Sequence, residues 1–344
     1  MLRACRKTSK YLALRTYATV ESPVIVAKPP PAPSASPRAA LDDSLLSELS
    51  KTSSTTTTLP SLIQQYLQRS SHVLETPLPY ESRPEAGRRI TFDSDLNDAA
   101  VMIAHCVQHE STHNITLCSG FALEVSGDLE RQSVVLGCAH TLEEIRRSPL
   151  LISDHLSASL NPSSSVPLKS GSFIVSHLPS PGKLATFHPV SAVLSSLHRS
   201  DLVLFSTQKD VRLKTLPVSP YPAHPDTPVR AHFIADTPPD EDGWTPWVGG
   251  TWSKWVKGTV LGYRDFAGRE AKPGTYDALS HMLFKPPPTA GSSGGPIVDE
   301  ESGAVVGVML GTRMDNQIEG VRGWGVPSEA IFEMFKLPGL DLVM

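Results

Sequence analysis

The sequence Gly291-Ser-Ser-Gly-Gly-Pro296 lies near the end of the 344-residue chain and fits the pattern G-x-S-G-G-P. A serine hydroxyl becomes a good nucleophile only with a base beside it, and the oxyanion that its attack forms needs backbone N–H donors. Glycines permit the tight turn that presents such donors, here the amides of Gly291 and Ser293. Composition alone produces this pattern in roughly one shuffled chain in a thousand, which favours a nucleophile turn over a plain glycine-rich turn.

Short apolar runs surround this motif and recur from about residue 85 onward, separated by Gly, Pro, Ser and Asp. They are rich in Val, Ile, Leu and Phe, and no long helical pattern lies between them, which favours an all-β sandwich or a pair of barrels. One helix is expected at 327–335, with Ser328 as its N-cap. The expected strands are 101–107, 115–125, 133–138, 171–178, 201–206, 229–235, 256–263, 296–298 and 304–310.

A histidine and an aspartate stand at the ends of two of these runs. His140 follows the run 133–138, and Asp201 opens the run 201–206. The order His140, Asp201, Ser293 and these contexts resemble the chymotrypsin-clan serine proteases, most closely the HtrA/Deg branch. The segments 119–121, 303–308 and 323–328 also match that branch, and the resemblance covers about 95–337. It implies two antiparallel six-stranded β-barrels with the site in the cleft between them.

The resemblance implies a serine endopeptidase that acts on polypeptides and needs no cofactor or metal. Ser293 would be the nucleophile, His140 the general base and then acid, and Asp201 the group that orients the imidazole. The amides of Gly291 and Ser293 would form the oxyanion hole. The strand that follows the motif would pair with the substrate backbone, and its binding residues would be Val308, Met309, Leu310 and Gly311.

Several departures from the family pattern stand out. Only 51 residues follow Ser293, which leaves no room for a C-terminal PDZ domain, and no Ile-Val-Gly-Gly terminus opens the domain. Ser292 stands where Asn or Asp is commoner. The prolines of 286–288 lie where the wall of the specificity pocket would be, and the lack of an acid there disfavours specificity for basic residues. We expect surface loops in the long insertion 142–190.

The first 17 residues are basic. They contain five Lys or Arg and no Asp or Glu, and 15–18 resembles a mitochondrial processing site. This composition predicts a transit peptide at 1–17 and a mitochondrial location, in the matrix, with a basic disordered terminus as the alternative. Residues 18–84 are rich in Pro, Ser and Thr, which predicts a disordered linker with short helices at 45–49 and 60–72. The protease domain would then be 85–344.

Charge and hydropathy argue against nucleic-acid binding and against a transmembrane segment. The chain has 31 Lys and Arg against 35 Asp and Glu, for a net charge of −4, whereas nucleic-acid-binding domains are usually basic. No apolar run reaches 18 residues, so we expect no transmembrane segment. Oligomerisation stays open.

Four cysteines are too few for a disulfide scaffold. Cys118 lies where secreted relatives have one half of a disulfide beside the histidine, but the partner position is Thr141, and Cys138 lies out of register. We expect free thiols, with an oxidised Cys118–Cys138 pair as the alternative.

The segment His109-Glu-Ser-Thr-His113 offers a rival chemistry, because H-E-x-x-H on a helix can bind zinc. The Ser-Thr centre and the apolar runs on both sides favour a hairpin instead, with this segment as its loop. We therefore prefer the serine chemistry to a zinc hydrolase.

Four tryptophans, Trp244, Trp247, Trp252 and Trp255, flank the turn Gly249-Gly250. They predict cross-strand packing or, alternatively, an exposed partner-binding patch on the hairpin 244–255. A catalytically silent protein of the same fold, acting as a binding or assembly subunit, is the alternative to the enzyme.

Overall fold

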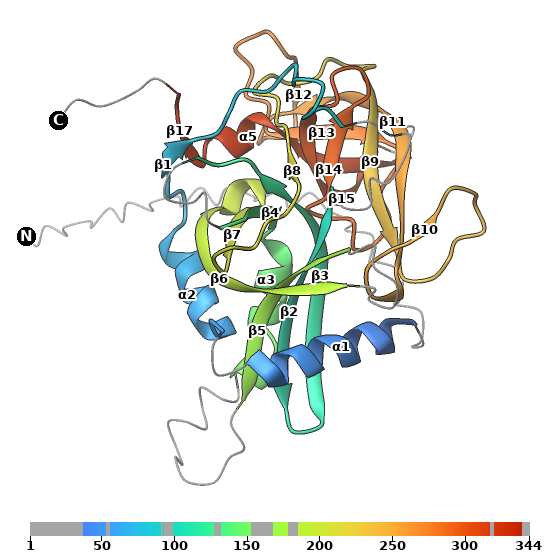
Figure 1. Cartoon of the computed structure of the whole chain (residues 1–344). Coiled ribbons are helices and arrows are strands. Elements are labelled where there is room, and N and C mark those ends of the chain that lie inside the picture. Colours follow the sequence, from blue (N-terminus) through green and yellow to red (C-terminus); the bar gives the residue numbers. More distant parts are fainter. Residues whose placement is uncertain are drawn as a thin grey trace, which may run out of the picture.

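The structure, a computed structural model, describes residues 37–52, 56–90, 92, 99–126, 132–152, 168–177, 185–316 and 320–338. Nearly all of the described strands belong to two sheets whose long strands run antiparallel, and each sheet closes on itself (Figure 1). The predicted transit peptide and the first part of the predicted linker, 18–36, lie outside the described residues.

The first barrel has the spatial order β2-β5-β6-β7-β4-β3 and is closed by the pairing of β2 with β3. Strand β2 is buried along seven consecutive residues, because one face lines the barrel and the other is covered by a helix. A short strand, β8 (Thr215–Leu216), adds to β3 in parallel. The barrel strands are β2 (Val101–His109), β3 (Thr112–Leu123), β4 (Val134–Cys138), β5 (Lys169–Ser176), β6 (Thr186–Leu197) and β7 (Leu202–Thr207).

The second barrel has the order β9-β11-β13-β16-β15-β14, and β14 closes it onto β9. Two short strands, β10 (Thr245–Pro246) and β12 (Glu270–Ala271), add to β11. The prediction of two antiparallel six-stranded barrels is confirmed, and this is the trypsin-like serine protease fold. The barrel strands are β9 (Pro228–Ala235), β11 (Trp252–Arg264), β13 (His281–Lys285), β14 (Pro296–Asp299), β15 (Val305–Asn316) and β16 (Gly320–Pro327).

The N-terminal segment differs from the expected linker in its described part, 37–52 and 56–84. Helix α1 (Pro37–Thr52) buries Leu41, Leu45 and Leu49, which its 3.6-residue period places on one face. This face lies on β2 and β5 of the first barrel and also contacts η4 (Val248–Gly250) of the second (Figure 1). The burial of these three leucines stabilises the segment against the barrels in spite of its polar composition, so it is part of the folded unit.

A second helix, α2 (Leu59–Gln68), agrees with the helix expected at 60–72 and packs on β6, β5 and β2. Beyond it, β1 (Leu74–Pro77) pairs in parallel with the C-terminal strand β17 (Phe335–Lys336). The helix expected at 327–335 is the single turn α5 (Glu329–Phe332). None of the described helices is long and apolar enough to cross a membrane.

Three barrel strands escaped the sequence analysis. Strand β6 contains Pro189 and several serines, β13 carries His281 and Lys285 at its ends, and β16 has three glycines. Such compositions lower intrinsic strand propensity, and barrel closure overrides it here. Within 142–190, where we expected surface loops, β5 agrees with the strand expected at 171–178, and the loop expectation is wrong at the start of β6.

Candidate active site

His140 and Asp201 meet because two antiparallel neighbours hold them. Cys138, the last residue of β4, pairs with Leu202, the first residue of β7, so the residues just beyond these ends lie side by side. Asp201 adopts a left-handed conformation, with φ 54°, after the 3₁₀ turn η3 (His198–Ser200). Its carbonyl oxygen accepts a hydrogen bond of 2.9 Å from Ala139 N, which fixes the two chain ends against each other.

The Asp201 carboxylate is bound to His140 through both oxygens. Oδ2 lies 2.6 Å from His140 Nδ1, and Oδ1 accepts a 2.7 Å hydrogen bond from His140 N. A carboxylate at this distance accepts a hydrogen bond from Nδ1–H, which leaves Nε2 of the neutral ring unprotonated and able to act as a base. The structure thus places two of the predicted catalytic residues in the geometry of a base and its orienting acid.

Two opposing effects set the pKa of the His140 imidazole. Burial lowers it, whereas the hydrogen bond to Asp201 and the carboxylate charge raise it by more, so the pKa of His140 lies above its ordinary value of 6.5. The pair therefore stabilises the imidazolium, which is the form produced when the ring accepts a proton.

Ser293 lies on a turn that closes against both barrels. Gly294 N donates to Met309 O at 2.7 Å, and Met309 N donates to Gly295 O at 2.9 Å, which ties the turn to β15. Ser119 N of β3 donates to Ser293 O at 2.8 Å, so the first barrel holds the nucleophile turn directly. A Cβ on Gly294 would collide with Ser119 O and lie 2.9 Å from Cys138 N. This glycine is therefore required by the close approach of the barrels.

A second anchor of this turn was missed by the sequence analysis. Ser292 is fully buried, and its Oγ accepts a 3.0 Å hydrogen bond from Ile234 N. Thr289 Oγ1 lies 2.8 Å from Ser292 Oγ and donates to Ile234 O at 2.6 Å. The departure at Ser292 was visible in the sequence, but its partners on β9 come from 58 residues upstream.

The predicted oxyanion donors are free. In the described part of the chain, no group accepts a hydrogen bond from the amides of Gly291 or Ser293. Gly291 has a φ of 82°, in the region that glycine enters without strain. Neither amide has a competing acceptor among the described residues, and their role as oxyanion donors stays a prediction.

The two atoms that must exchange a proton are each engaged elsewhere. Ser293 Oγ donates to Leu310 O at 2.9 Å, and His140 Nε2 lies 3.5 Å from Cys138 Sγ. Among the described residues, no hydrogen bond joins Ser293 to His140. In the described structure the His140–Asp201 pair is thus formed, and the predicted nucleophile Ser293 is not bonded to His140.

The predicted substrate strand needs a correction. Val308 pairs with Pro296 of β14 and with Val326 of β16, and the Met309 backbone is bound to the nucleophile turn, so neither can pair with a substrate. Both side chains are fully buried. Beyond Met309, only β16 pairs with β15 among the described strands, so the free edge begins at Leu310 and continues through Gly311.

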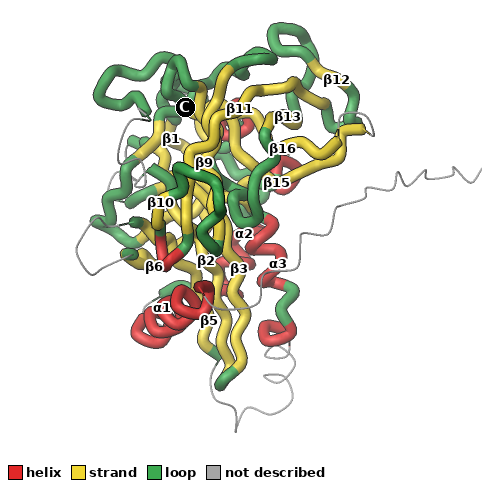
Figure 2. The backbone as a smooth tube through the Cα atoms, turned by 90° about the vertical axis from the view of Figure 1, so that its right-hand side faces the viewer, coloured by secondary structure: helices red, strands yellow, loops and turns green. Residues whose placement is uncertain are grey.

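The H-E-x-x-H segment is the expected hairpin. His109 ends β2, Glu110 is in the turn with a φ of 52°, and His113 pairs with Gln108. Figure 2 shows β2 and β3 side by side as the two strands of this hairpin. The helical zinc alternative is therefore wrong, because it needs both histidines on one helical face. Across the described residues, no three His, Cys, Asp or Glu side chains group as a metal site would require.

The tryptophans of the hairpin 244–255 pack inward. Trp247 is fully buried, and its ring and that of Trp255 lie 5.0 and 5.2 Å from the buried His232 ring. Burial lowers the pKa of His232 to about 3, so this histidine is a neutral core residue. Trp244 and Trp252 are partly buried. These positions favour the packing interpretation, and a partner-binding role of the hairpin 244–255 stays a prediction.

The described cysteines are free and buried, as expected: Cys106, Cys118 and Cys138. Thr141 Oγ1 donates to Cys118 Sγ at 3.3 Å and lies 3.9 Å from Cys138 Sγ. The sequence analysis missed the contact of Cys138 with His140, because the two side chains meet only where the chain turns from the end of β4 into α3.

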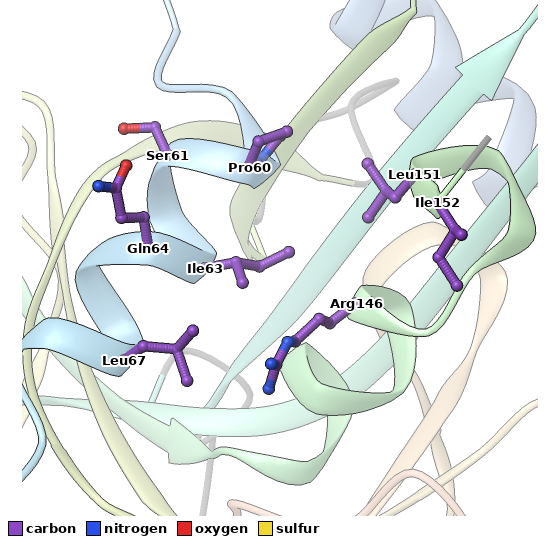
Figure 3. A pocket seen from close by; sticks show the side chains of 8 residues that line it. All are labelled: Pro60, Ser61, Ile63, Gln64, Leu67, Arg146, Leu151 and Ile152. Carbon is purple, nitrogen blue, oxygen red and sulfur yellow. The ribbon is translucent and has the colours of Figure 1, made fainter. Parts of the chain in front are cut away.

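A groove of about 500 Å³ lies between α2 and α3 (His140–Arg146), lined by Ile63, Leu67, Arg146 and Leu151 among others (Figure 3). It contains none of the predicted catalytic side chains. We therefore place the candidate site at Ser293 and the His140–Asp201 pair, not in this groove.

No family model and no curated protein matches this chain. Among solved structures it is similar to Deg5, with 13% identity, 68% of this chain and 86% of that chain covered, and a TM-score of 0.42. It is also similar to the apo MamO protease domain from Magnetospirillum magneticum, with 16% identity, 69% and 95% covered, and a TM-score of 0.39. A third is Rv3671c from M. tuberculosis H37Rv, an inactive serine-to-alanine mutant, with 16% identity, 75% and 94% covered, and a TM-score of 0.38.

Proposed function

We propose that the chain is a serine endopeptidase that cleaves polypeptides through an acyl-enzyme. The observation that carries this proposal is the His140–Asp201 pair, in which a 2.6 Å contact orients the imidazole at the end of the first barrel. The nucleophile turn of the second barrel is bound to the same region through Ser119 N. A base, its orienting carboxylate and a serine turn with two free amides are the parts that acyl transfer requires.

The free edge of β15 suggests how a substrate completes the triad. An extended peptide paired with this edge donates an N–H group to Leu310 O, which is the acceptor that Ser293 Oγ uses in the unbound protein. Ser293 then loses this acceptor, and its hydroxyl turns toward His140 Nε2. Substrate binding and activation of the nucleophile are coupled in this way.

The chemistry then follows from the groups in place. His140 Nε2 accepts the Ser293 proton as Oγ attacks the scissile carbonyl, and the Gly291 and Ser293 amides bind the resulting oxyanion. The imidazolium, stabilised by Asp201, protonates the leaving amine. Water, activated by the same imidazole, releases the acyl group from Ser293 and restores the serine.

Labelling with a fluorophosphonate probe tests the proposal, because the probe reacts with an activated serine and needs no known substrate. We expect labelling of the folded full chain that mass spectrometry maps to Ser293. Ser293→Ala should abolish the label, and the matched variant Ser47→Ala, at an exposed serine of α1, should keep it. Absence of any Ser293-dependent label on folded protein refutes the enzyme.

A silent subunit of this fold is the second candidate, and the open Ser–His bond favours it. If Ser293 stays on Leu310 O when a peptide binds, the protein holds its ligand without cutting it. Retained peptide binding with no label on Ser293 would establish this alternative, and a labelled Ser293 excludes it.

We place this activity in mitochondrial protein quality control or processing, on the basis of the basic, acid-free residues 1–17. N-terminal sequencing of the protein purified from mitochondria should give a mature chain that begins near residue 18. Recovery of a chain that starts at Met1, or its absence from mitochondria, would refute this location.

A further inference from the structure

The base nitrogen of His140 has a neighbour in the described structure, and that neighbour is not Ser293. Cys138 Sγ lies 3.5 Å from His140 Nε2, which is a hydrogen-bonding distance for sulfur. Asp201 accepts a hydrogen bond from Nδ1–H, so Nε2 of the neutral ring can only accept, and the Cys138 thiol is the donor. The thiol therefore occupies the lone pair that must receive the serine proton.

We infer that Cys138 is a positioning residue that competes with Ser293 for the base nitrogen of His140 in the unbound protein. This inference rests on the proposed function, because it assigns a role within the same triad. The Cys138 thiol stays hydrogen-bonded to His140 Nε2 until a bound substrate takes Leu310 O, which is the acceptor of Ser293 Oγ in the unbound protein.

The contact is built into the fold. Cys138 is fully buried, and its backbone pairs with Leu202 of β7. Thr141 and Cys118 pack on the far side of the thiol, and Thr141 Oγ1 contacts both sulfurs. The sulfur therefore cannot leave the ring without displacing the core of the first barrel, whereas the partly exposed imidazole can turn.

A thiol suits this competition because it is a weak donor. A neutral hydrogen bond contributes about 1 kcal/mol net, and an S–H donor gives less than an O–H donor. Burial raises the pKa of the Cys138 thiol well above its ordinary value, so the group is a neutral donor and not a thiolate paired with an imidazolium. The serine hydroxyl, a stronger donor, can replace it once released from Leu310 O.

Other charged groups also act on the His140 ring, and they set the background for a test. Asp201 faces Nδ1, Glu144 lies on the same helix as His140, and Cys118 lies on β3. All three raise the pKa of His140 and so favour the imidazolium. A thiol that donates to the neutral ring acts in the opposite sense and lowers the pKa of His140.

Two substitutions at one position separate this role from packing. Cys138→Ala removes the donor, so the fluorophosphonate labelling rate should rise about 5-fold, the factor that corresponds to about 1 kcal/mol. The midpoint of its pH profile should move upward. Cys138→Ser installs a stronger donor, so labelling should slow and the midpoint should move downward. Cys106→Ala, a fully buried thiol on β2 outside the triad, should change neither quantity.

A histidine NMR titration gives a readout that does not need a reactive serine. The pKa of His140 should be higher in Cys138→Ala than in the wild type and lower in Cys138→Ser. If both variants slow labelling equally, or if neither moves the pKa of His140, Cys138 is only a core residue and the inference is wrong. If the folded wild type takes no label, the proposed function fails. The His140 titration then still decides whether the Cys138 thiol donates a hydrogen bond to His140 Nε2.

Discussion

Replacing Leu45 with alanine tests whether α1 belongs to the folded unit of this protein. Leu45 is fully buried in a cluster that also contains Met102 of β2, Phe173 of β5 and Trp247. Truncation of a buried leucine loses its transfer free energy and leaves a cavity, which together cost about 3 kcal/mol. The higher helix propensity of alanine returns only a few tenths of a kcal/mol.

Urea unfolding monitored by tryptophan fluorescence measures this cost, because Trp247 reports on the same cluster. We expect a clearly lower unfolding midpoint for Leu45→Ala. For Ser47→Ala, on the exposed face of α1, we expect a free energy of unfolding within about 0.5 kcal/mol of the wild type. Equal midpoints for the two variants would show that α1 does not pack on the barrels, and the folded unit would then begin after it.

Three further changes probe the site itself. Asp201→Asn removes the charge that favours the imidazolium, so the pKa of His140 should fall in an NMR titration, and Ser293 labelling should drop by about 10⁴-fold; an unchanged pKa would contradict the assigned pair. Gly294→Ala should destabilise the protein by more than about 3 kcal/mol in a thermal melt, because its Cβ meets backbone of the other barrel and its φ is 82°. Thr289→Val removes a tether of the nucleophile turn, so peptide hydrolysis should show kcat reduced about 10-fold with KM nearly constant; an unchanged kcat would show that this tether does not position Ser293.

The barrels and the His–Asp pair could be predicted from the sequence because their signals are local. His140 and Asp201 each border an apolar run, and the pairing of β4 with β7 brings those borders together. The nucleophile turn was marked by glycines that the approach of two barrels requires. The residue types and the chain direction were therefore enough to locate these groups.

The state of the triad could not be predicted in this way. Whether Ser293 Oγ points to Leu310 O or to His140 is a choice between rotamers that differ by about 1 kcal/mol, which no local pattern encodes. For a related reason, we predicted that the substrate-binding edge begins at Val308, whereas the free edge begins two residues later, at Leu310. The backbone of Met309 is hydrogen-bonded to Gly294 and Gly295, and this tertiary contact leaves no pattern in the local sequence.

The N-terminal helix was underestimated because composition was averaged over 18–84. Leu41, Leu45 and Leu49 recur every four residues, but Pro, Ser and Thr on both sides dilute this period. The surface that receives the leucines is assembled from β2, β5 and η4, which lie 49 or more residues further along the chain. Tertiary contacts, not local propensity, make the helix part of the fold.

The position of α1 across both barrels affects how natural variants of this protein should be interpreted. The helix touches the barrel that carries His140 and the barrel that carries Ser293, yet it contributes no atom to either group. A substitution on its apolar face can shift one barrel against the other, which would reduce the proposed activity even though His140, Asp201 and Ser293 are unchanged. A clinical or evolutionary survey that scores only residues near the nucleophile would class such a change as harmless, and the N-terminal leucines belong in that survey.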